Sequence, residues 1–394
     1  MPHLSRLAGT ARPTKGTSMR TGKLLAALFA LALLVTACGG SDGESAESEA
    51  ASEPAAATSE AGGASEAGSE GGTSSTDASD VRAAIVTDVG GLGDQSFNDS
   101  ANAGLERAIS EMGAEGNVLE SGSPTDYVNN LTQLAQNQFS PVFAVGFLMT
   151  DALNEVAPQY PDQSFAIIDS VVEQPNVASI NFREEEGSYL VGVVAGLMTQ
   201  EDTEYTTADD NTVGFLGGLE GPLIKKFEAG FKAGVASVCE DCEVLAEYAG
   251  TTPDAFNDPA AGQEISLRLN DQGADVIYHA SGGTGAGLFE AANDRQFFAI
   301  GVDSDQAALN PGVPILTSML KRVDNAVFQT IEAFANDEFP GGDIQTFGIA
   351  EEGIALAPFG EFEDLVPAEV TDAVDQARQE IIDGNVEVPT EPEQ

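Results

Sequence analysis

Short apolar runs alternate with amphipathic segments from Val81 onward. The runs have the length of buried strands, and we expect strands at 83–89, 117–121, 142–147, 164–170 and 177–182. Between them, apolar positions recur at helical spacing, which predicts helices near 98–112, 126–138 and 150–159. Strands that alternate with helices in this way are typical of a parallel sheet with helices on both faces.

The same alternation then begins a second time. We expect strands at 212–218, 243–250, 275–281 and 297–303, with helices near 222–238, 258–271 and 284–293. These are followed by an expected strand at 315–322, a helix at 323–337, a strand at 346–350 and a helix near 367–384. Two successive sets predict an α/β protein with two similar lobes, although we detect no sequence repeat between them.

The late elements have to be shared between the lobes. We expect an N-terminal lobe of residues 81–182 plus about 315–340, and a C-terminal lobe of residues 183–314 plus about 341–394. Ligands of open α/β sheets bind beyond the carboxyl ends of the strands. Two lobes whose strand ends face each other would therefore enclose one ligand cleft.

The segment before the folded part has the order of an export signal. Arg20 and Lys23 precede an apolar run over 24–37, which ends in small residues before Cys38. This order resembles a bacterial lipobox, so we expect residues 1–37 to be a signal peptide and Cys38 to become the lipidated first residue. An uncleaved membrane anchor is disfavoured because the run of 14 residues is shorter than the roughly 20 that span a bilayer.

Residues 39–80 contain no aromatic and no large aliphatic side chain. Such a segment cannot bury a core, so we expect 38–80 to be the lipidated cysteine and a disordered acidic linker. A lipid on Cys38 followed by this linker would hold the folded part at the extracytoplasmic face of the cell membrane.

Composition narrows the classes of partner. The 394 residues include 42% hydrophobic positions, enough for two domains with their own cores. Acidic residues outnumber basic ones 64 to 16, which gives a net charge of -48. This charge repels phosphate backbones, so we expect no nucleic-acid partner. Our hypothesis is that the acidic surface keeps the protein solvated in high salt. A fold that is equally stable without added salt would contradict it.

Two cysteines remain in the folded part. Cys239 and Cys242 form CEDC, and export favours a disulfide between them. A zinc site is disfavoured because His279 is the sole histidine beyond the linker. A redox role is disfavoured because the acidic neighbours would raise the pKa of a thiol. We expect no metal and no cofactor.

The stretch TDVGGLGDQSFNDSANAGLERA at 87–108 combines a glycine-rich turn with candidate binding groups. Asp88 ends the first strand, and Ser96 followed by Asp99 has the spacing of a capping box. Phe97 and Asn98 would then lie in the first helical turn, at the mouth of the cleft. There a ring can stack on a planar ligand, and an amide can hydrogen-bond the edge of a heterocycle.

This stretch resembles the first motif of the basic membrane protein family, the purine nucleoside receptor lipoproteins of bacterial ABC transporters. The resemblance extends over the folded part through FLGGLEGPLIKKFEAGFKAGV (215–235), AFNDPAAGQEIS (255–266), SGGTGAG (281–287), IGVDSDQ (300–306) and TSMLKRVDNAVF (317–328). It implies the type I periplasmic binding protein fold, in which two Rossmann-like lobes joined by three hinge crossings close on a ligand.

The resemblance also implies roles for individual residues. Phe97 and Phe256 would sandwich the base, and Asn98 and Asp169 would hydrogen-bond its polar edge. The ribose hydroxyls would be bound by the remaining group, which consists of Asp88, Asp303, Lys321 and the backbone of Gly282 or Gly283. Burying Asp303 is costly without a cation, and Lys321 is a candidate to offset that cost.

The function that these residues favour is capture of a purine nucleoside and its delivery to the ABC permease subunits in the membrane. A sugar or another small ligand is an alternative, although it has less need of two opposed rings. An exported hydrolase that uses Asp88, Asp169 and Asp303 is a further alternative. The folded part, from residue 81 onward, carries no G-x-S-x-G or H-E-x-x-H motif, so we expect a binding protein and not an enzyme. A cation site at Asp303 and Asp305 is disfavoured because the spacing of a calcium loop is absent.

Overall fold

The computed structural model describes residues 76–208 and 211–392, all within the compact unit Gly71–Gln394. The expected signal peptide, Cys38 and the linker up to residue 75 lie outside the described residues. The linker prediction is wrong at its end, because Thr76 and Ala78 contact the folded part: the Thr76 hydroxyl donates to Glu332. Ala78 is buried, and its amide donates to the carbonyl of Met112.

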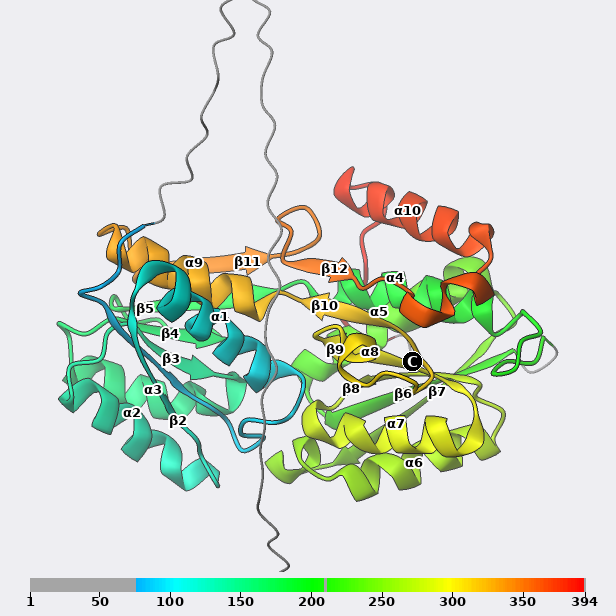
Figure 1. Cartoon of the computed structure of the whole chain (residues 1–394), viewed down its shortest axis with the longest axis horizontal. Helices are drawn as coiled ribbons and strands as arrows, with labels where there is room; N and C mark the ends of the chain where they lie inside the picture. Colours follow the sequence, from blue (N-terminus) through cyan, green and yellow to red (C-terminus); the bar gives the residue numbers. More distant parts are fainter. Residues whose placement is uncertain (1–75, 209–210, 393–394) are drawn as a thin grey trace, which may run out of the picture. The chain divides into compact units, whose positions relative to one another are not determined.

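The first sheet has six parallel strands in the order β11-β5-β4-β3-β1-β2. They are β1 (Arg82–Val86), β2 (Glu115–Leu119), β3 (Val142–Val145), β4 (Phe165–Ile168), β5 (Val177–Phe182) and β11 (Ile344–Phe347). Helices α1 (Phe97–Met112) and α9 (Val323–Ala335) cover one face, and α2 (Tyr127–Gln136) and α3 (Thr150–Val156) cover the other (Figure 1). Because both faces are covered, β3 and β4 are buried at every position, which explains their uninterrupted apolar sequences.

The second sheet has the order β12-β10-β9-β8-β6-β7 and so repeats the strand order of the first. Its strands are β6 (Thr212–Leu219), β7 (Glu243–Gly250), β8 (Val276–Ala280), β9 (Phe298–Asp303), β10 (Ile315–Lys321) and the antiparallel β12 (Ile354–Leu356). Helices α4 (Glu184–Met198) and α5 (Pro222–Val238) lie on one face, with α10 (Ala368–Ile382) packed on α4. Helices α6 (Pro259–Asp271) and α7 (Gly285–Arg295) lie on the other face, and the short α8 (Gln306–Leu309) follows β9 (Figure 1). We call the two halves the first and the second lobe.

The structure corrects the predicted division of the late elements. The strand expected in the N-terminal lobe at 315–322 is β10, which pairs with β9 and β12 of the second sheet. The strand expected in the C-terminal lobe at 346–350 begins earlier as β11 and pairs with β5 of the first sheet. The reason is that an apolar run indicates burial but does not identify the strand beside it. The chain consequently crosses between the lobes after β5, after β10 and after β11.

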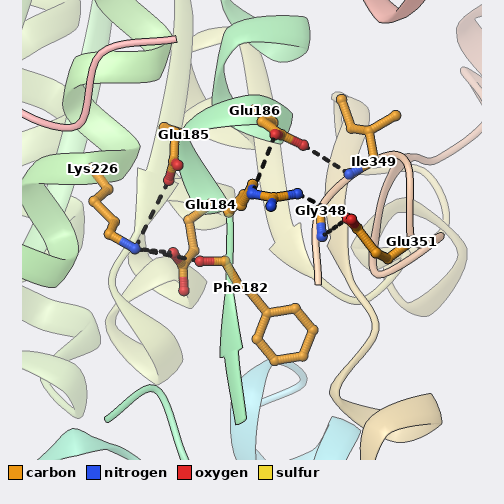
Figure 2. Close-up of polar contacts among 9 residues, drawn as sticks. Phe182, Glu184, Glu185, Glu186, Lys226, Gly348, Ile349 and Glu351 are labelled. Atoms are coloured by element: carbon orange, nitrogen blue, oxygen red, sulfur yellow. Dashed lines mark hydrogen bonds and ion pairs between the residues drawn. The ribbon is translucent and has the colours of Figure 1, made fainter. Parts of the chain in front are cut away.

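Polar contacts tie the first crossing to the third (Figure 2). Arg183 follows β5, and its guanidinium lies 2.9 Å from the Glu351 carboxylate and 3.7 Å from that of Glu186. The amides of Ile349 and Gly348, just beyond β11, donate to Glu186 and Glu351 respectively. The two connecting segments are therefore held together by both charge and backbone hydrogen bonds.

No helix within residues 76–208 and 211–392 has the length and apolar character needed to cross a membrane.

Candidate ligand-binding cleft

A cleft lies between the lobes, at the carboxyl ends of strands from both sheets. About 570 Å³ of space lies between its lining atoms, open solvent at its mouth included. All the residues that the resemblance assigned to the site line it except Gly283: Asp88, Phe97, Asn98, Asp169, Phe256, Gly282, Asp303 and Lys321. Gly283 instead lines a neighbouring surface groove.

The loop before α1 is organised by Asp94, which the sequence reasoning did not single out. One carboxylate oxygen of Asp94 accepts from the amides of Ser96 and Asp99, and the other accepts from the amide and the side chain of Asn98. Asp94 therefore satisfies the free amides at the start of the helix. Gly91 and Gly93 have positive φ values of 64° and 92°, which lets the chain turn tightly here.

The predicted capping box of Ser96 and Asp99 is wrong. The Ser96 side chain makes no capping hydrogen bond and donates instead to Asp303 of the second lobe. The Asp99 carboxylate accepts from the amides of Gly93 and Gln95. Because Asp94 already binds the amides of the first turn, the Ser96 hydroxyl is free to form a contact between the lobes.

Asn98 is buried, and both ends of its amide are engaged within the protein. Its oxygen accepts from the Asp88 amide at 3.2 Å, and its nitrogen donates to the carboxylates of Asp88 (2.9 Å) and Asp94 (3.0 Å). The Asp88 oxygen that Asn98 contacts also accepts from the Gly90 amide at 2.9 Å. The position of the Asp88 carboxylate in the cleft is thus set by two donors.

Asp169 and Asp303 occupy equivalent places in the two lobes. Asp169 directly follows β4, and Asp303 ends β9, the strand at the same position in the second sheet. Their φ values are 64° and 66°, a left-handed conformation that residues other than glycine seldom adopt. Such conformations concentrate at functional sites, and here the pair turns two carboxylates into one cleft.

One ammonium group serves this acidic cleft. Lys321 ends β10, and its nitrogen lies 2.6 Å from Asp169 and 3.1 Å from Glu184. It also lies 5.1 Å from the ring centres of Phe97 and Phe182, within the range of a cation–π interaction. The Lys321 side chain is only 2% exposed, and carboxylates of both lobes contact it.

The aromatic residues of the cleft also come from both lobes. Phe256 ends a short 3-10 helix, Pro253–Phe256, and its ring meets that of Phe147 edge-on at 6.2 Å. A side chain at Gly218 would overlap the Phe256 ring, so glycine makes room for it. Gly146 likewise lies close to an aromatic side chain. A Cβ added at Gly146 would lie 3.3 Å from the Phe97 ring.

Further hydrogen bonds join the rims of the cleft. The side chain of Gln306 donates to the carbonyl of Gln95 at 3.1 Å, and that of Asn310 donates to the side chain of Gln95 at 2.9 Å. Together with the contact between Ser96 and Asp303, they connect the loop before α1 to the segment after β9. The lobes thus meet through direct hydrogen bonds beside the cleft.

Residues 81–392 match the family described as PnrA-like ABC transporter substrate-binding proteins. The chain belongs to this family. It is 34% identical over 344 residues to the ABC transporter nucleoside-binding protein BmpA of Lactococcus lactis, covering 81% of this chain and 92% of that protein. An uncharacterized lipoprotein of Pyrococcus abyssi is 36% identical over 340 residues, covering 79% and 81%. A crystal structure of solute-binding proteins of an ABC transporter system from Aeropyrum pernix K1 superposes with a TM-score of 0.70 at 28% identity, covering 80% and 94%.

Burial determines the protonation behaviour of this PnrA-like cleft. It raises the pKa of Asp88 and of Asp303 to about 6, and that of Asp169 to about 7 although Lys321 opposes the effect. For Lys321, burial disfavours the charged form, but attraction by Asp169 and Glu184 is stronger and raises its pKa. A ligand that donates hydrogen bonds to these carboxylates would relieve part of the cost of burying them.

Several side chains in or behind the cleft were not predicted from the sequence, among them Asp94, Phe147, Phe227 and Glu184. Asp94 lay inside the quoted motif, where its spacing to the helix start was a usable signal. Phe147 and Phe227 line the cleft, but they follow or interrupt apolar segments and read as core residues. Glu184 begins a run of three glutamates that resembles a solvated first turn of a helix, yet it is fully buried.

The cysteines and the histidine of the folded part take no place in the cleft lining. A disulfide joins Cys239 to Cys242 after α5. His279 is fully buried in β8, contacts Gln306 at 2.9 Å, and has its pKa lowered by burial to about 4. In the part of the chain that the structure describes, no group of three His, Cys, Asp or Glu side chains could hold a metal ion.

Proposed function

We propose that this substrate-binding protein is a lipid-anchored receptor that captures purine nucleosides for an ABC importer. The observation that carries the proposal is the lining of the cleft, where aromatic rings adjoin a buried cluster of carboxylates around one ammonium. A nucleoside combines a flat base with a ribose rich in hydroxyls. Rings suit the base, and charged hydrogen-bonding groups suit the ribose.

The base would lie between Phe97 and Phe256, one ring from each lobe. Each stacked ring would contribute about 1–3 kcal/mol. The edge contact of Phe147 supports the Phe256 ring from the side. Asp169 would accept from the polar edge of the base. Asn98 would act through its neighbours, because its amide is already committed to the two carboxylates that it holds.

The ribose would be bound by Asp88, Asp303 and Lys321, with the backbone of Gly282 nearby. Ribose hydroxyls can donate to the carboxylates and accept from the ammonium. Asp303 already contacts Ser96 of the opposite lobe, so a ligand held by Asp303 would favour the closed arrangement.

Delivery would take place at the outer face of the cell membrane. The lipobox-like sequence before Cys38 supports lipid anchoring, and the related Pyrococcus abyssi protein is named a lipoprotein. The permease subunits in that membrane would be the partners that receive the ligand. We propose capture without chemistry, so a bound nucleoside would leave the cleft unaltered.

Thermal unfolding with and without ligand tests this function. A ligand that binds the folded state alone raises the unfolding temperature. We expect inosine and guanosine at saturating concentration to raise it by several degrees, ribose to leave it unchanged, and the Asp303→Asn variant to lose most of the nucleoside effect. Absence of any nucleoside effect on wild-type protein would refute the proposal. Release of free base from inosine would instead indicate a hydrolase.

A further inference from the structure

Glu184 is a buried carboxylate behind the cleft, outside its lining. It is the first residue of α4, directly after the first crossing between the lobes. One oxygen faces the nitrogen of Lys321 at 3.1 Å, and the other accepts from Lys226 of α5 at 3.2 Å. Lys226 also donates to the carbonyl of Phe182, so it is fixed relative to the crossing itself (Figure 2).

The ammonium of Lys321 has three N–H donors. It donates a hydrogen bond to Asp169 at 2.6 Å, and the Glu184 carboxylate attracts it as an ion pair at 3.1 Å without a hydrogen bond. The Lys321 side chain lines the cleft, so an N–H that Asp169 does not bind is available to a ligand. With Asp169 alone as partner, the ammonium could rotate about that single contact, whereas two carboxylates on different elements define its direction.

We propose that Glu184 is a positioning residue for ligand recognition, which holds Lys321 so that its free N–H points at a ribose hydroxyl, with Lys226 bracing Glu184 from the opposite side. This role rests on the proposed function, because it takes a ribonucleoside as the ligand. It assigns a binding task to two residues that the ligand does not touch.

A double-mutant cycle with Lys321 tests the proposal on the full-length protein in mild detergent. Inosine affinity is measured by calorimetry for wild type, Glu184→Gln, Lys321→Met and the double variant. We expect Glu184→Gln to weaken inosine binding about tenfold. If Glu184 acts through Lys321, the same substitution in the Lys321→Met background has no further effect. Equal losses in both backgrounds would show a merely structural role and overturn the proposal.

Glu186→Gln is the matched control, because Glu186 lies in the same turn of α4 but contacts Arg183 and Ile349 instead of Lys321. Its effect on affinity should be the same whether or not Lys321 is present. Lys226→Met provides a second route, since Lys226 is 31% exposed and tolerates substitution better. We expect a smaller loss that also disappears in the Lys321→Met background. If Glu184→Gln does not fold, the test rests on Lys226→Met. Inosine affinity of Lys226→Met equal to that of wild type would then overturn the proposal.

The pH dependence of inosine affinity separates the two explanations, because a purely structural effect of Glu184→Gln would not shift it. The groups that face Asp169 are Lys321, Glu184, Asp303 and Asp88, and repulsion from Glu184 contributes to the raised pKa of Asp169. Removing the Glu184 charge should therefore move the acid limb of inosine affinity to lower pH, and an unmoved limb would contradict the inference.

Failure of the proposed function is a separate outcome, since it would show as a wild-type protein that binds no nucleoside. In that case the role of Glu184 is refuted with it. If wild type binds and Glu184→Gln binds equally well, the role of Glu184 alone is refuted.

Discussion

Replacing Asp88 with Asn should stabilise the ligand-free protein while it weakens nucleoside binding. Asp88 is 8% exposed, and burial raises its pKa from 3.8 to about 6. One oxygen of Asp88 accepts from Gly90 and Asn98, and an amide oxygen in the same place can accept both hydrogen bonds. The substitution therefore removes the buried charge and retains its two donors.

The magnitude follows from the pKa difference. One pKa unit corresponds to about 1.4 kcal/mol, so ionised Asp88 costs the folded state about 3 kcal/mol. Below about pH 4 the carboxyl is protonated in both folded and unfolded states, and it carries no such cost. As the pH rises through about 4 to 6, the unfolded state loses its proton first, so wild-type stability falls relative to Asp88→Asn. Above about pH 6 the difference stays at its full value.

Urea unfolding of both proteins from about pH 4 to pH 8, at constant ionic strength and without ligand, measures this difference. Asp151→Asn is the control, because Asp151 is exposed on α3 and its replacement should change the free energy of unfolding by less than about 0.5 kcal/mol. An Asp88→Asn variant that is no more stable than wild type at pH 8, or whose gain does not vary with pH, would refute the reasoning.

Three other predictions concern binding and the disulfide. Phe97→Ala should weaken purine nucleoside affinity tenfold or more in calorimetry, since a stacked ring contributes about 1–3 kcal/mol; unchanged affinity would exclude Phe97 from the site. Nucleoside binding near pH 6 to 7 should release protons, because a donor on the edge of the base favours the ionised form of Asp169, whose pKa is about 7. Calorimetry in buffers of different ionisation enthalpy detects this release, and proton uptake would contradict it. Replacing Cys239 and Cys242 with Ser should lower the free energy of unfolding by about 2 kcal/mol, the loop entropy of a four-residue closure, with nucleoside affinity unchanged.

The strands and helices could be predicted because both sheets are covered on two faces. Parallel strands in that setting are apolar throughout, as β3 and β4 are, and the helices between them show a clear period. The candidate site could be predicted because Asp88, Asp169 and Asp303 each mark the carboxyl end of a strand. Two lobes of equal topology bring those ends together.

The exchange of late strands could not be predicted in the same way. β10 joins the second sheet and β11 joins the first, and nothing in either strand's own sequence identifies the strand beside it. Their assignment depends on which edge each strand meets after the crossing, which is a tertiary contact.

Glu184 was missed for a related reason. Its burial depends on Lys321 and Lys226, which lie far from it in the sequence. A run of glutamates at a helix start is ordinarily exposed.

The most direct test of the account is calorimetric titration of the full-length protein, shown to be folded and free of carried-over ligand, in molar salt. The titrants are inosine, guanosine, adenosine, cytidine and ribose. The account predicts tight binding of the purine nucleosides with ribose inert. No detectable binding of any titrant would contradict the proposed ligand. Binding of ribose as tight as that of inosine would show that the aromatic side of the cleft does not recognise a base.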